Sequence, residues 1–573
     1  MSEAFDVAIV GGGPAGSTAG TLLKRYAPDL RVLILERETF PRDHVGESQL
    51  PEVGRVLNEM GVWDKVEAAG FPIKIGATYK WGGDGRLWDF EFVPMAQFPV
   101  EPRPARYVGV RTETAFQVDR AIYDKILLDH ARESGCDVRE GTRVRRVERD
   151  GDRIAALETD AGTVTAGYYL DASGNAAIMR RALGVPVEEP TILQNIAIWD
   201  YWQNVAWAEN IGGGPTRIQV MSLGWGWIWF IPLGPTRTSV GLVVPARAYK
   251  EAGVRPQELY DRALREEPRI RQLLEGGHPE GKLSSTKDWS FVADRLAGPN
   301  WFLVGEAAGF ADPILSAGMT LAHTAAREAA YTILSLERGE HDPEWLRNRY
   351  SEVQSKRIRQ HMRFAEFWYA ANGIFTDLKA FTAEIAAEAG LKLDANEAFY
   401  WLSSGGFTNE NFGGAGAGFF SIEAVKQFAQ RMTGTSSDWA ISRNNVFRMD
   451  VKGARRSSVT AFHEGRIYLE DSLVRDGHEL PFTGLYGVVI QTLHRYSAIG
   501  DIAQGFLKYF RENPWLEDVN ASVRNAFHTL EAMIAEGWVV ASLDPTQPGL
   551  RFSTPDETLC MHLHTPDNPV ETG

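Results

Sequence analysis

The chain has 573 residues, of which 44% are hydrophobic, 24% charged and 11% aromatic, and its formal net charge is -15. Such a length and composition predict a globular protein of two or three domains. The acidic balance excludes nucleic acid as a bulk partner, because a phosphate backbone would be repelled. Two cysteines are too few for a disulfide framework or a zinc site, which favours a cytoplasmic protein without a metal. No apolar run reaches the length of a membrane span.

A short apolar run followed by a glycine turn opens the chain, over residues 6–16. Gly11, Gly13 and Gly16 match the pattern G-x-G-x-x-G. The first glycine allows a tight turn, the second lets backbone approach a pyrophosphate, and the third lets the next helix pack close to the strand. That helix, expected over 16–25, directs its positive N-terminal end at the phosphates.

An acidic residue follows the second predicted strand, over 31–35, and this residue is Glu36. In dinucleotide-binding folds a carboxylate about 20 residues beyond the glycine turn holds a ribose hydroxyl. A glycine-rich turn without a nucleotide is the alternative, because G-x-G-x-x-G alone is a weak signal. Here strand, turn, helix, strand and acid occur in order, which favours nucleotide binding.

The apolar pattern predicts mixed helices and strands as far as residue 371. In chain order we expect a helix over 51–60, strands over 72–81, 87–92 and 106–110, a helix over 121–134, a strand meander over 137–166, a strand over 168–171, long strands over 192–244, a strand over 301–305, and helices over 319–337 and 343–371.

The character of the sequence changes beyond about residue 374. The glycine run at 413–418 lacks the preceding strand and the following Lys-Ser/Thr of a phosphate-binding loop. Cys560, His562 and His564 are metal-ligand types without a second ligand pair, so no metal site is expected. Residues 466–545 read as a strand, three helices over 482–493, 498–512 and 519–536, and a strand over 538–542. This order resembles a winged-helix module, for which a lid or partner-docking role fits the acidic chain better than DNA binding.

Three segments together resemble the FAD-binding fold of the p-hydroxybenzoate hydroxylase superfamily. They are the glycine turn with Glu36, the turn Asp-Ala-Ser-Gly over 171–174, and the motif Gly-Glu-Ala-Ala-Gly-Phe-Ala-Asp-Pro over 305–313. The last motif usually begins Gly-Asp, and its acid binds the ribityl chain. Glu306 is one methylene longer, so that contact would shift. The resemblance also implies that Arg120, at a helix start, reaches the flavin.

The resemblance implies a set of FAD-binding residues spread over these segments. They are Gly11, Gly13, Pro14, Ala15, Gly16, Glu36, Arg37, Glu47, Ser48, Arg120, Asp171, Gly174, Gly305, Glu306, Asp312 and Pro313.

Further motifs resemble those of flavin-dependent halogenases. Residues 227–232 match W-x-W-x-I-P, residues 312–318 match D-P-x-x-S-x-G, and residues 46–48 match the G-E-S loop of that family. Lys74 stands seven residues before Trp81, in a segment like the one that carries the essential lysine of the family. The resemblance covers about residues 5–370. It is nearest to the branch acting on phenols, pyrroles, or carrier-tethered and polyketide-like substrates.

The chemistry that the resemblance implies needs reduced FAD from a separate flavin reductase, O2, and chloride or bromide. Hypohalous acid formed near the flavin passes along an internal tunnel to the catalytic Lys74. There an electron-rich carbon of an aromatic, enolic or carrier-tethered small molecule takes the halogen, so a carrier protein is a possible partner. Desolvation lowers the pKa of a buried lysine and makes its amine a competent nucleophile.

Two further groups of residues are implied by the same resemblance. Backbone N–H groups at Ser316, Ala317 and Gly318 would form an anion site for the halide. Bulky side chains would separate the substrate from the flavin, and these belong to Trp227, Trp229, Ile231 and Pro232.

Plainer interpretations of these residues stay open. Lys74 could be a solvated lysine, and Lys80 competes with it, because on a regular strand both lysines point to the same face. The tryptophans could belong to the core, since W-x-W alternation also places both on one sheet face. Ser316 could cap the following helix rather than act chemically. Arginines at 357, 359 and 363 could dock a carrier protein, although a solvated helix face is the simpler interpretation.

The overall prediction is an α/β protein (α+β overall) with a Rossmann-type FAD-binding domain and an inserted antiparallel β-sheet substrate domain. Residues 1–372 would form this core and residues 373–573 a mainly helical C-terminal domain. The FAD-binding segments would be about 1–60, 105–185 and 285–340, and the substrate sheet about 70–110 and 186–285.

The functional prediction is a flavin-dependent halogenase that acts on a secondary-metabolite precursor. The alternative is an FAD-dependent aromatic monooxygenase or a geranylgeranyl-reductase-like oxidoreductase without halide chemistry. Ordinary hydroxylases lack the lysine and the W-x-W-x-I-P segment, so the presence of Lys74 and of this segment distinguishes the two predictions. A flavoprotein sensor whose C-terminal module binds a partner is a third, non-enzymatic possibility.

Overall fold

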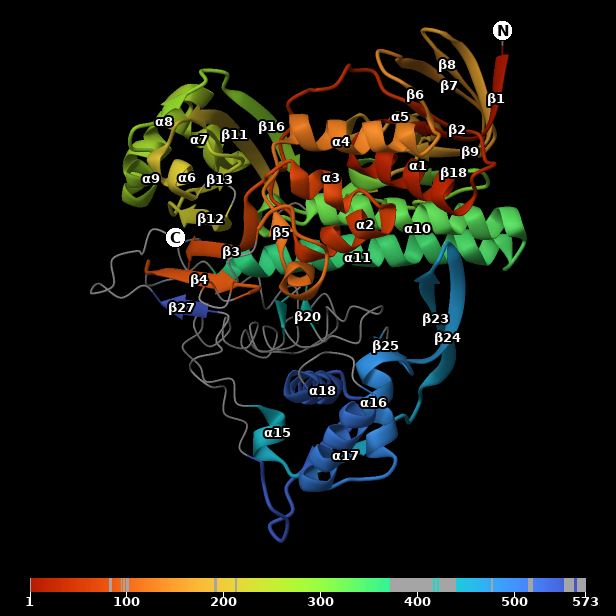
Figure 1. The fold of residues 1–573 in the computed structure, drawn as a ribbon, viewed down its shortest axis with the longest axis vertical. Helices are drawn as coiled ribbons and strands as arrows, with labels where there is room; N and C mark the ends of the chain where they lie inside the picture. The colour runs from red at the N-terminus through yellow and green to blue at the C-terminus, as the bar shows by residue number, and fades with distance from the viewer. Residues whose placement is uncertain are drawn as a thin grey trace. The chain divides into compact units, whose positions relative to one another are not determined.

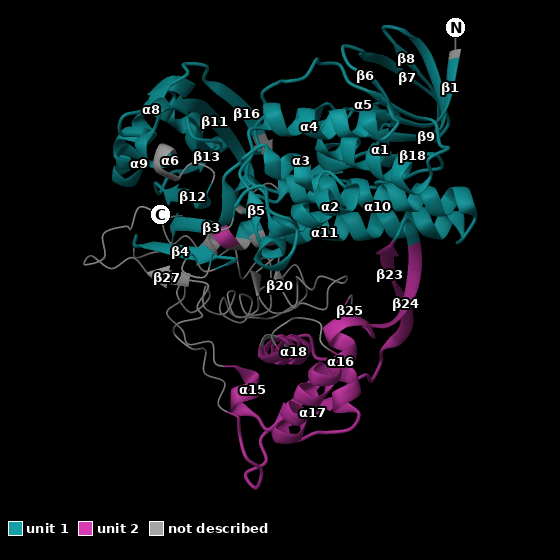
Figure 2. Cartoon of the chain, viewed as in Figure 1, with its two compact units in different colours: residues 1–366, 464–466, 562–573 teal, residues 367–463, 467–561 magenta. Residues whose placement is uncertain are grey.

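The structure is a computed structural model, and the residues that it describes form two compact units (Figure 2). Unit 1 comprises residues 1–366, 464–466 and 562–573, and unit 2 comprises residues 367–463 and 467–561. The described residues are 2–81, 85–93, 95, 98, 102–189, 193–211, 214–371, 416–417, 420–421, 439–475, 478–513, 519–550 and 561–563. Most of the glycine run at 413–418, as well as Cys560 and His564, lies outside them.

The first layer of unit 1 is a mostly parallel sheet with β1 near its centre (Figure 1). Its strands, in spatial order, are β6 (Asp137–Arg139), β2 (Val32–Leu35), β1 (Ser2–Val10), β9 (Gly162–Asp171), β8 (Arg153–Thr159) and β7 (Val144–Asp150), and β18 (Trp301–Leu303) also pairs with β9. Val10 is opposite Asp171, which is in turn opposite Leu303, in parallel pairs. The turns that follow β1, β9 and β18 therefore meet at one edge of the sheet, where doubly wound folds bind their ligands.

The second layer of unit 1 is a large, mostly antiparallel sheet. Its order is β15 (His278–Pro279), β11 (Gln194–Gln203), β14 (Arg237–Pro245), β13 (Trp227–Pro232), β12 (Pro215–Ser222), β3 (Ile73–Lys80), β4 (Leu87–Glu91) and β27 (Met561–Leu563), with β16 (Ser284–Trp289) on β11 and β5 (Ala115–Phe116) on β3. Strands β3 and β12 pair in parallel. A small third sheet contains β10 (Val187–Glu188), β17 (Phe291–Ala293) and β19 (Gly309–Phe310). The α/β fold with an inserted sheet is confirmed.

The two faces of the second sheet are covered by different parts of unit 1. Alternate residues, among them Ile228, Phe230 and Leu242, pack with Tyr260 and Ile270 of the short helices in one core cluster. Those helices are α6 (Ala206–Ile211), α7 (Ala246–Ala252), α8 (Pro256–Glu266) and α9 (Pro268–Leu273), and Figure 1 shows them on one side of the sheet. Since side chains alternate along a strand, Trp227, Trp229 and their neighbours across the sheet lie on the other face.

That other face of the second sheet is directed at the FAD-binding segments. Two side chains of β11 demonstrate this: Asn195 donates a hydrogen bond to Asp312, and Tyr201 donates one to Glu47. The residue pairs between β11, β14 and β13 place Asn195, Tyr201 and the two tryptophans on the same face of the sheet. We call this side the flavin-facing side of the sheet.

A bulge in β3 changes the face on which its residues lie. Thr216 is opposite Lys74, whereas the next residue of β12, Arg217, is opposite Gly76, so Ile75 is an extra residue. An extra residue in one strand inverts the alternation of side chains beyond it. Lys74 therefore lies on the flavin-facing side while Lys80 lies on the helix side. The expectation that both lysines point to the same face is wrong.

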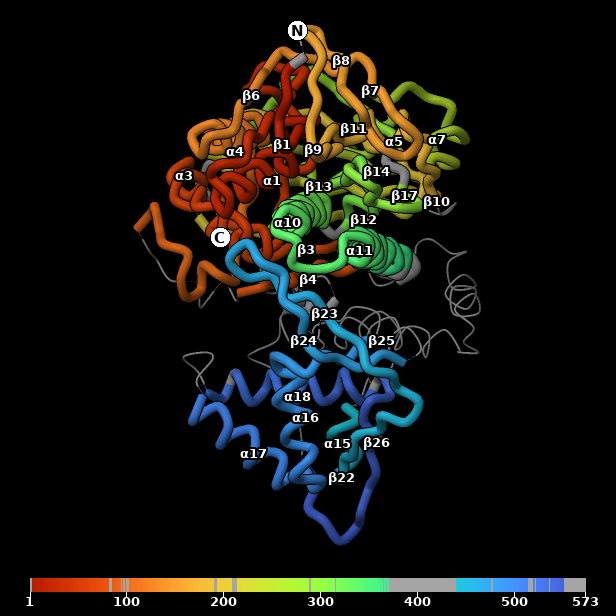
Figure 3. Tube along the Cα trace, turned by 90° about the vertical axis from the view of Figure 1, so that its right-hand side faces the viewer, coloured from red at the N-terminus to blue at the C-terminus, as the bar shows by residue number. Residues whose placement is uncertain are grey.

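Helices of unit 1 pack on the parallel sheet. They are α1 (Pro14–Tyr26), α2 (Pro51–Met60), α3 (Trp63–Ala68), α4 (Arg120–Glu133), α5 (Ile178–Leu183), α10 (Gly318–Arg338) and α11 (Pro343–Ala371). Figure 3 shows α10 and α11 end-on, so the axes of the two long helices are nearly parallel while the chain runs along them in opposite directions. Arg357 of α11 donates to buried Glu328 of α10 at 2.9 Å, which joins them.

One predicted strand is absent. Residues 106–110 form no strand, and the 3-10 helix η2 (Gly109–Glu113) begins there. The reason is Arg111, which is buried, pairs with Glu67 at 2.8 Å and lies over the rings of Trp63 and Phe116. The 3-10 helix at residues 109–113 allows the Arg111 guanidinium to be buried against Glu67, which an extended strand there would not do. The strand that joins β3 comes slightly later, at β5.

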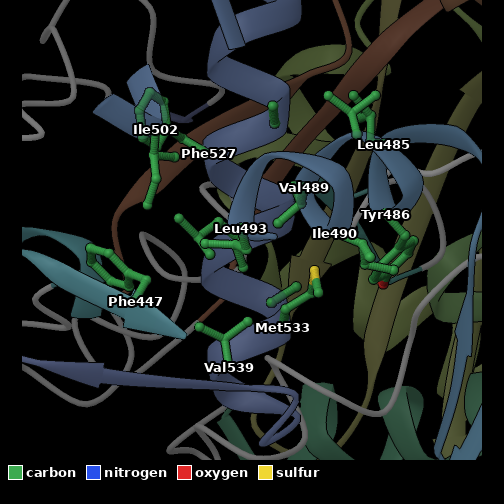
Figure 4. Packing of buried hydrophobic residues seen from close by; sticks show 14 of the residues in the cluster. Phe447, Leu485, Tyr486, Val489, Ile490, Leu493, Ile502, Phe527, Met533 and Val539 are labelled. Carbon is green, nitrogen blue, oxygen red and sulfur yellow. The ribbon is translucent and has the colours of Figure 1, made fainter. Parts of the chain in front are cut away.

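Unit 2 has its own hydrophobic core between three helices. Its elements are α15 (Ala440–Arg443), β22 (Val446–Met449), β23 (Arg455–His463), β24 (Arg466–Arg475), β25 (His478–Pro481), α16 (Gly484–Leu493), α17 (Ile499–Glu512), α18 (Val519–Ala535) and β26 (Val539–Ser542). Figure 4 shows Val489 and Leu493 of α16 gathered with Met533 of α18 and Val539 of β26. The three helices and the final strand lie where the sequence predicts them, and β26 pairs with β22. Two short strands complete the described elements: β20 (Gly416–Ala417) and β21 (Phe420–Ser421).

Candidate active site

The glycine turn after β1 has the close backbone contacts that only glycine allows. A Cβ on Gly11, whose φ is +108°, would lie 2.2 Å from the carbonyl oxygen of Ala172. A Cβ on Gly16 would lie 1.9 Å from the oxygen of Gly11. Gly13 differs, because the nearest atom to its Cβ would be an Arg42 nitrogen at 3.6 Å. Its backbone therefore faces open space at the N-terminal end of α1, which fits a pyrophosphate.

Glu36 lies against this turn. One carboxylate oxygen accepts the N–H of Gly12 at 2.7 Å and the other accepts the N–H of Glu38 at 2.9 Å. The buried side chain is thereby held at the end of β2, where a ribose hydroxyl would be bound. Arg37, the next residue, is exposed and pairs with Glu38 at 3.2 Å. Pro14 and Ala15 are buried in the first turn of α1.

The turn after β9 is shaped by Asp171. Its carboxylate accepts the N–H and hydroxyl of Ser173 and the N–H groups of Met179 and Arg180, at 2.5 to 3.2 Å. These bonds hold Gly174 (φ +61°) in the 3-10 helix η3 (Gly174–Ala176). The structure thus uses Asp171 to set the backbone that faces the ligand.

The third turn brings an acid to the same edge. Glu306 lies in the 3-10 helix η4 (Gly305–Ala307), and its Oε2 would be 3.7 Å from a Cβ on Gly174. Burial raises the pKa of Glu306, and the charge of Arg120 opposes that rise. The three turns therefore meet at one edge of the sheet with a buried acid beside them, an arrangement that fits a dinucleotide.

Arg120 connects α4 to the loop after Arg42. Its guanidinium binds both oxygens of Asp124, at 2.7 and 2.9 Å, and donates to the carbonyls of Val45 and Gly46, each at 3.0 Å. Arg42 adds a second cation 3.3 Å from Asp124. Arg120 therefore fixes the backbone of the G-E-S loop.

Glu47 of the G-E-S loop is a buried carboxyl held by the second sheet. It accepts the hydroxyl of Tyr201 at 3.1 Å and the N–H of Gly46 at 3.1 Å. Burial raises the pKa of Glu47 to about 7, and the Tyr201 hydroxyl and Arg120 oppose this. Ser48, the next residue, forms a backbone bridge with Gln117.

The ammonium of Lys74 contacts Gln49, the residue that follows the G-E-S loop. Its Nζ donates to the backbone carbonyl of Gln49 at 2.9 Å and lies 5.7 Å from the ring centre of Phe92. The side chain is buried, and burial lowers the pKa of Lys74 to about 7. Lys80, by contrast, pairs with Glu267 at 2.6 Å on the helix side. Of these two lysines, Lys74 is the one whose amine is desolvated and lies on the side of the segments predicted to bind FAD.

The two tryptophans of β13 lie on the flavin-facing side and contact each other. The ring centres of Trp227 and Trp229 are 6.0 Å apart, and Trp81 meets Trp227 edge-on at 6.5 Å. The indole N–H of Trp229 donates to Ser239 at 3.0 Å, and its ring lies so close to Gly241 that a Cβ there would be 2.1 Å away. Ile231 lies on the same face as the tryptophans, whereas Pro232 lies on the opposite face of the sheet. The aromatic cluster forms a wall on the side that bears Lys74.

The D-P-x-x-S-x-G turn leads into α10. Asp312 caps the 3-10 helix η5 (Pro313–Leu315) by accepting the N–H of Ile314 at 2.9 Å, and it is held by Asn195 at 3.1 Å. Ser316 follows with φ +58°, and Ala317 takes the N-cap position of α10 without a side-chain bond. The expectation that Ser316 caps this helix is wrong, because the cap falls one residue later.

The start of α10 faces open space. A Cβ on Gly318 would have no atom of the described residues within 4 Å. The N–H groups at the start of a 21-residue helix carry partial positive charge, so this position can hold an anion.

Several residues of the site went unnoticed in the sequence. Gln49 holds Lys74, Tyr201 holds Glu47 and Asn195 holds Asp312. The sequence signal for Tyr201 and Asn195 was their even spacing on one strand, which places these two side chains on one face of the sheet. No motif marks Gln49, whose role is a backbone contact.

The arginines of α11 do not form one solvated face. Arg357 is paired inside with Glu328, while Arg359 pairs with Glu188 at 3.0 Å and Arg363 is exposed. Across the described part of the chain no group of three or more His, Cys, Asp or Glu residues could hold a metal ion. No helix among those residues has the length and apolar character to cross a bilayer.

Fold and site together define a dinucleotide-binding flavoprotein, and family comparison agrees. The family model described as "FAD binding domain" matches residues 4–365. The chain is 36% identical over 351 residues to a tryptophan 2-halogenase of Chondromyces crocatus, covering 60% of this chain and 63% of that protein. It is 30% identical over 390 residues to a 1H-pyrrole-2-carbonyl (peptidyl-carrier protein) chlorinase of Pseudomonas fluorescens, covering 65% of this chain and 85% of that protein.

Solved structures extend the likeness. The flavin-dependent halogenase CmlS matches with a TM-score of 0.70 at 24% identity, over 96% of this chain and 98% of that one, which shows the shared fold. The myxobacterial chondrochloren halogenase CndH matches with a TM-score of 0.57 at 28% identity, over 75% of this chain and 97% of that one. The chain belongs to the flavin-dependent halogenases, a group of FAD-dependent enzymes within the FAD-binding family.

Proposed function

We propose that this enzyme uses FAD, O2 and chloride or bromide to halogenate an electron-rich carbon of a small aromatic or enolic molecule. The observation that carries the proposal is the position of Lys74. It is a buried amine on the flavin-facing side, held by Gln49, on the same face of the sheet as the aromatic wall. A hydroxylase has no need of such an amine.

The cradle residues would hold the cofactor. The open backbone at Gly13 and the helix start would hold the pyrophosphate, Glu36 would hold a ribose, and Glu306 would bind the ribityl chain. Reduced flavin with O2 supplies the oxidising power that turns halide into hypohalous acid. The start of α10 at Gly318 would hold the halide through backbone N–H groups.

Lys74 would present the halogen to the substrate. Burial lowers the pKa of Lys74 to about 7, so near neutral pH a large share of the amine is unprotonated and can accept the proton of hypohalous acid or take up the halogen. The substrate carbon then donates its electron pair to the halogen. A carbon–halogen bond forms, the bond from halogen to oxygen or nitrogen breaks, and the carbon loses a proton.

The wall of Trp227 and Trp229 would keep the substrate away from the flavin. The bond from Trp229 to Ser239 and the close packing on Gly241 hold the ring in one place. Direct transfer of oxygen to the substrate is thereby suppressed, and hypohalous acid is small enough to pass.

The substrate class follows from the relatives. They are named for tryptophan and for a carrier-bound pyrrole, both electron-rich heteroaromatic compounds. We propose a phenol, pyrrole or enol of secondary metabolism as substrate, free or tethered to a carrier protein, with reduced FAD delivered by a separate reductase in the cytoplasm.

The test combines product mass with one matched pair of variants. Wild-type protein, reduced FAD, O2 and bromide, incubated with electron-rich aromatic compounds, should yield a product with the bromine isotope pattern. Lys74→Ala should lose about 100-fold or more of this activity while still binding FAD. Lys80→Ala, six residues along the same strand, should retain it. Undiminished bromination by Lys74→Ala would remove this lysine from the reaction.

A further inference from the structure

Gln117 lies beside Lys74 on the flavin-facing side, and the reaction proposed above gives it no role. β5 pairs antiparallel with β3 so that Ala115 is opposite Lys74. Two residues later, the backbone N–H of Gln117 donates to the carbonyl of Pro72 at 3.0 Å. Since side chains alternate along a strand, Gln117 shares the face of Ala115 and Lys74.

The amide of Gln117 is held in one orientation. Its Nε2 donates to the hydroxyl of Thr216 at 3.4 Å, and Thr216 is the residue opposite Lys74 on β12. The Thr216 hydroxyl donates to the carbonyl of Arg217, so it is an acceptor toward Gln117. The Nε2 end of the amide is therefore directed at Thr216, and its carbonyl oxygen, Oε1, is left to accept a bond on the face that bears Lys74.

That carbonyl oxygen is buried without a hydrogen-bond partner. Gln117 is fully buried, and among the described residues neither its Oε1 nor the hydroxyl of Ser48, its partner in the backbone bridge, has a hydrogen-bond partner. Buried polar atoms in folded proteins are nearly always paired, because an unmade bond is costly. An unpaired acceptor on the face that bears a desolvated amine marks a place where a polar group of a ligand can bind.

We propose that Gln117 recognises the substrate by accepting a hydrogen bond from its hydroxyl or ring N–H group. This rests on the proposed function and adds the chemistry of recognition to it. Phenols, enols and pyrroles share one polar donor attached to the electron-rich system. An acceptor on that donor raises electron density at the ring carbons. It also fixes which carbon faces Lys74, so Gln117 would influence both rate and regiochemistry.

Two probes that differ only in donors test this recognition. Resorcinol carries two hydroxyl groups, and 1,3-dimethoxybenzene carries none. Ligand-observed NMR with FAD-loaded wild-type protein should show resorcinol binding at least about tenfold more tightly. Gln117→Met should lower the affinity for resorcinol until the two probes bind equally tightly. Gln117→Leu serves as a second truncation, and Gln117→Glu, which keeps an acceptor, should retain the preference.

Gln219 provides the matched control. It is also a buried glutamine whose Oε1 lacks a partner, but it lies on β12 opposite Phe230, on the helix side. Gln219→Met should leave the preference for resorcinol unchanged. Folding of each variant is verified by its flavin absorbance and thermal melt.

The outcomes separate this proposal from the one on which it rests. Equal affinity of the wild type for both probes, no binding of either, or an unchanged ratio in Gln117→Met would overturn the role of Gln117. A preference that depends on Gln117, in a protein that forms no brominated product, would instead overturn halogenation.

Discussion

Lys74 and Lys80 lie on the same strand but on opposite faces of the sheet. The even spacing of six residues would place them together, and the extra residue Ile75 separates them. Each ammonium consequently has a different partner: the carbonyl of Gln49 for Lys74 and the carboxylate of Glu267 for Lys80. One residue of bulge thus decides which lysine is a desolvated amine and which is part of an ordinary ion pair.

The first prediction concerns stability and the titration of Lys74. Its pKa falls from 10.5 in the unfolded chain to about 7 in the fold, so between these values the unfolded state binds more protons. Stability should therefore rise with pH from about 7 to 10.5, by up to about 1.4 kcal/mol per unit, and the contribution of Lys74 should stay constant below about pH 7, where both states are protonated. Lys74→Met removes this group, and its stability relative to wild type should be greater at pH 6.5 than at pH 9.5.

Denaturant unfolding at both pH values measures that difference, with Lys80→Met as the control. Lys80 keeps its carboxylate partner and should show no comparable gain at low pH. Equal pH dependence of the two variants would mean that Lys74 is solvated in solution.

The second prediction concerns Glu47. Burial raises its pKa from 4.5 to about 7, so between these values the folded state binds more protons. Its contribution is favourable at low pH and is lost as pH rises through 7. Glu47→Gln cannot ionise, so its stability relative to wild type should increase as pH rises from 4.5 to 7. Thermal melts across this range test the prediction, and a flat difference would contradict it.

The third prediction concerns the nucleotide cradle. Gly16→Ala would place a Cβ 1.9 Å from the backbone oxygen of Gly11, which must move the turn. FAD affinity should fall about tenfold or more, the equivalent of about 1.4 kcal/mol. Flavin fluorescence titration measures this. Gly500→Ala, in a helix with nothing within 4 Å, is the control and should bind FAD as wild type does.

The fourth prediction concerns the aromatic wall. Gly241→Ala would bring a Cβ within 2.1 Å of the Trp229 ring and force it from its position. Overpacking of this kind typically costs about 1–3 kcal/mol, so the thermal midpoint should fall. Gly234→Ala in the adjoining turn has no atom within 4 Å and should melt with the wild type. If both variants melt alike, the wall is looser than its packing indicates.

Much of the FAD cradle could be predicted from local sequence. Gly11, Gly13 and Glu36 act through contacts between neighbouring elements, and spacing reports such contacts well. The role of Asp171 was less visible, because its carboxylate serves the turn itself. Residues 106–110 were misjudged, because burying the Arg111 guanidinium outweighs the local preference for a strand.

By itself the sequence determined the strand–turn–helix cradle, the alternation that puts Trp227 and Trp229 on one face, and the family of flavin enzymes. These depend on residue type and on periods of 2 and 3.6 within one segment. Only the tertiary structure decided which lysine faces the flavin-binding segments, which carbonyl holds it, and that Gln117 is left with an unpaired acceptor beside it. Those outcomes depend on the register between strands far apart in the chain, where one unpaired residue reverses the direction of every side chain beyond it.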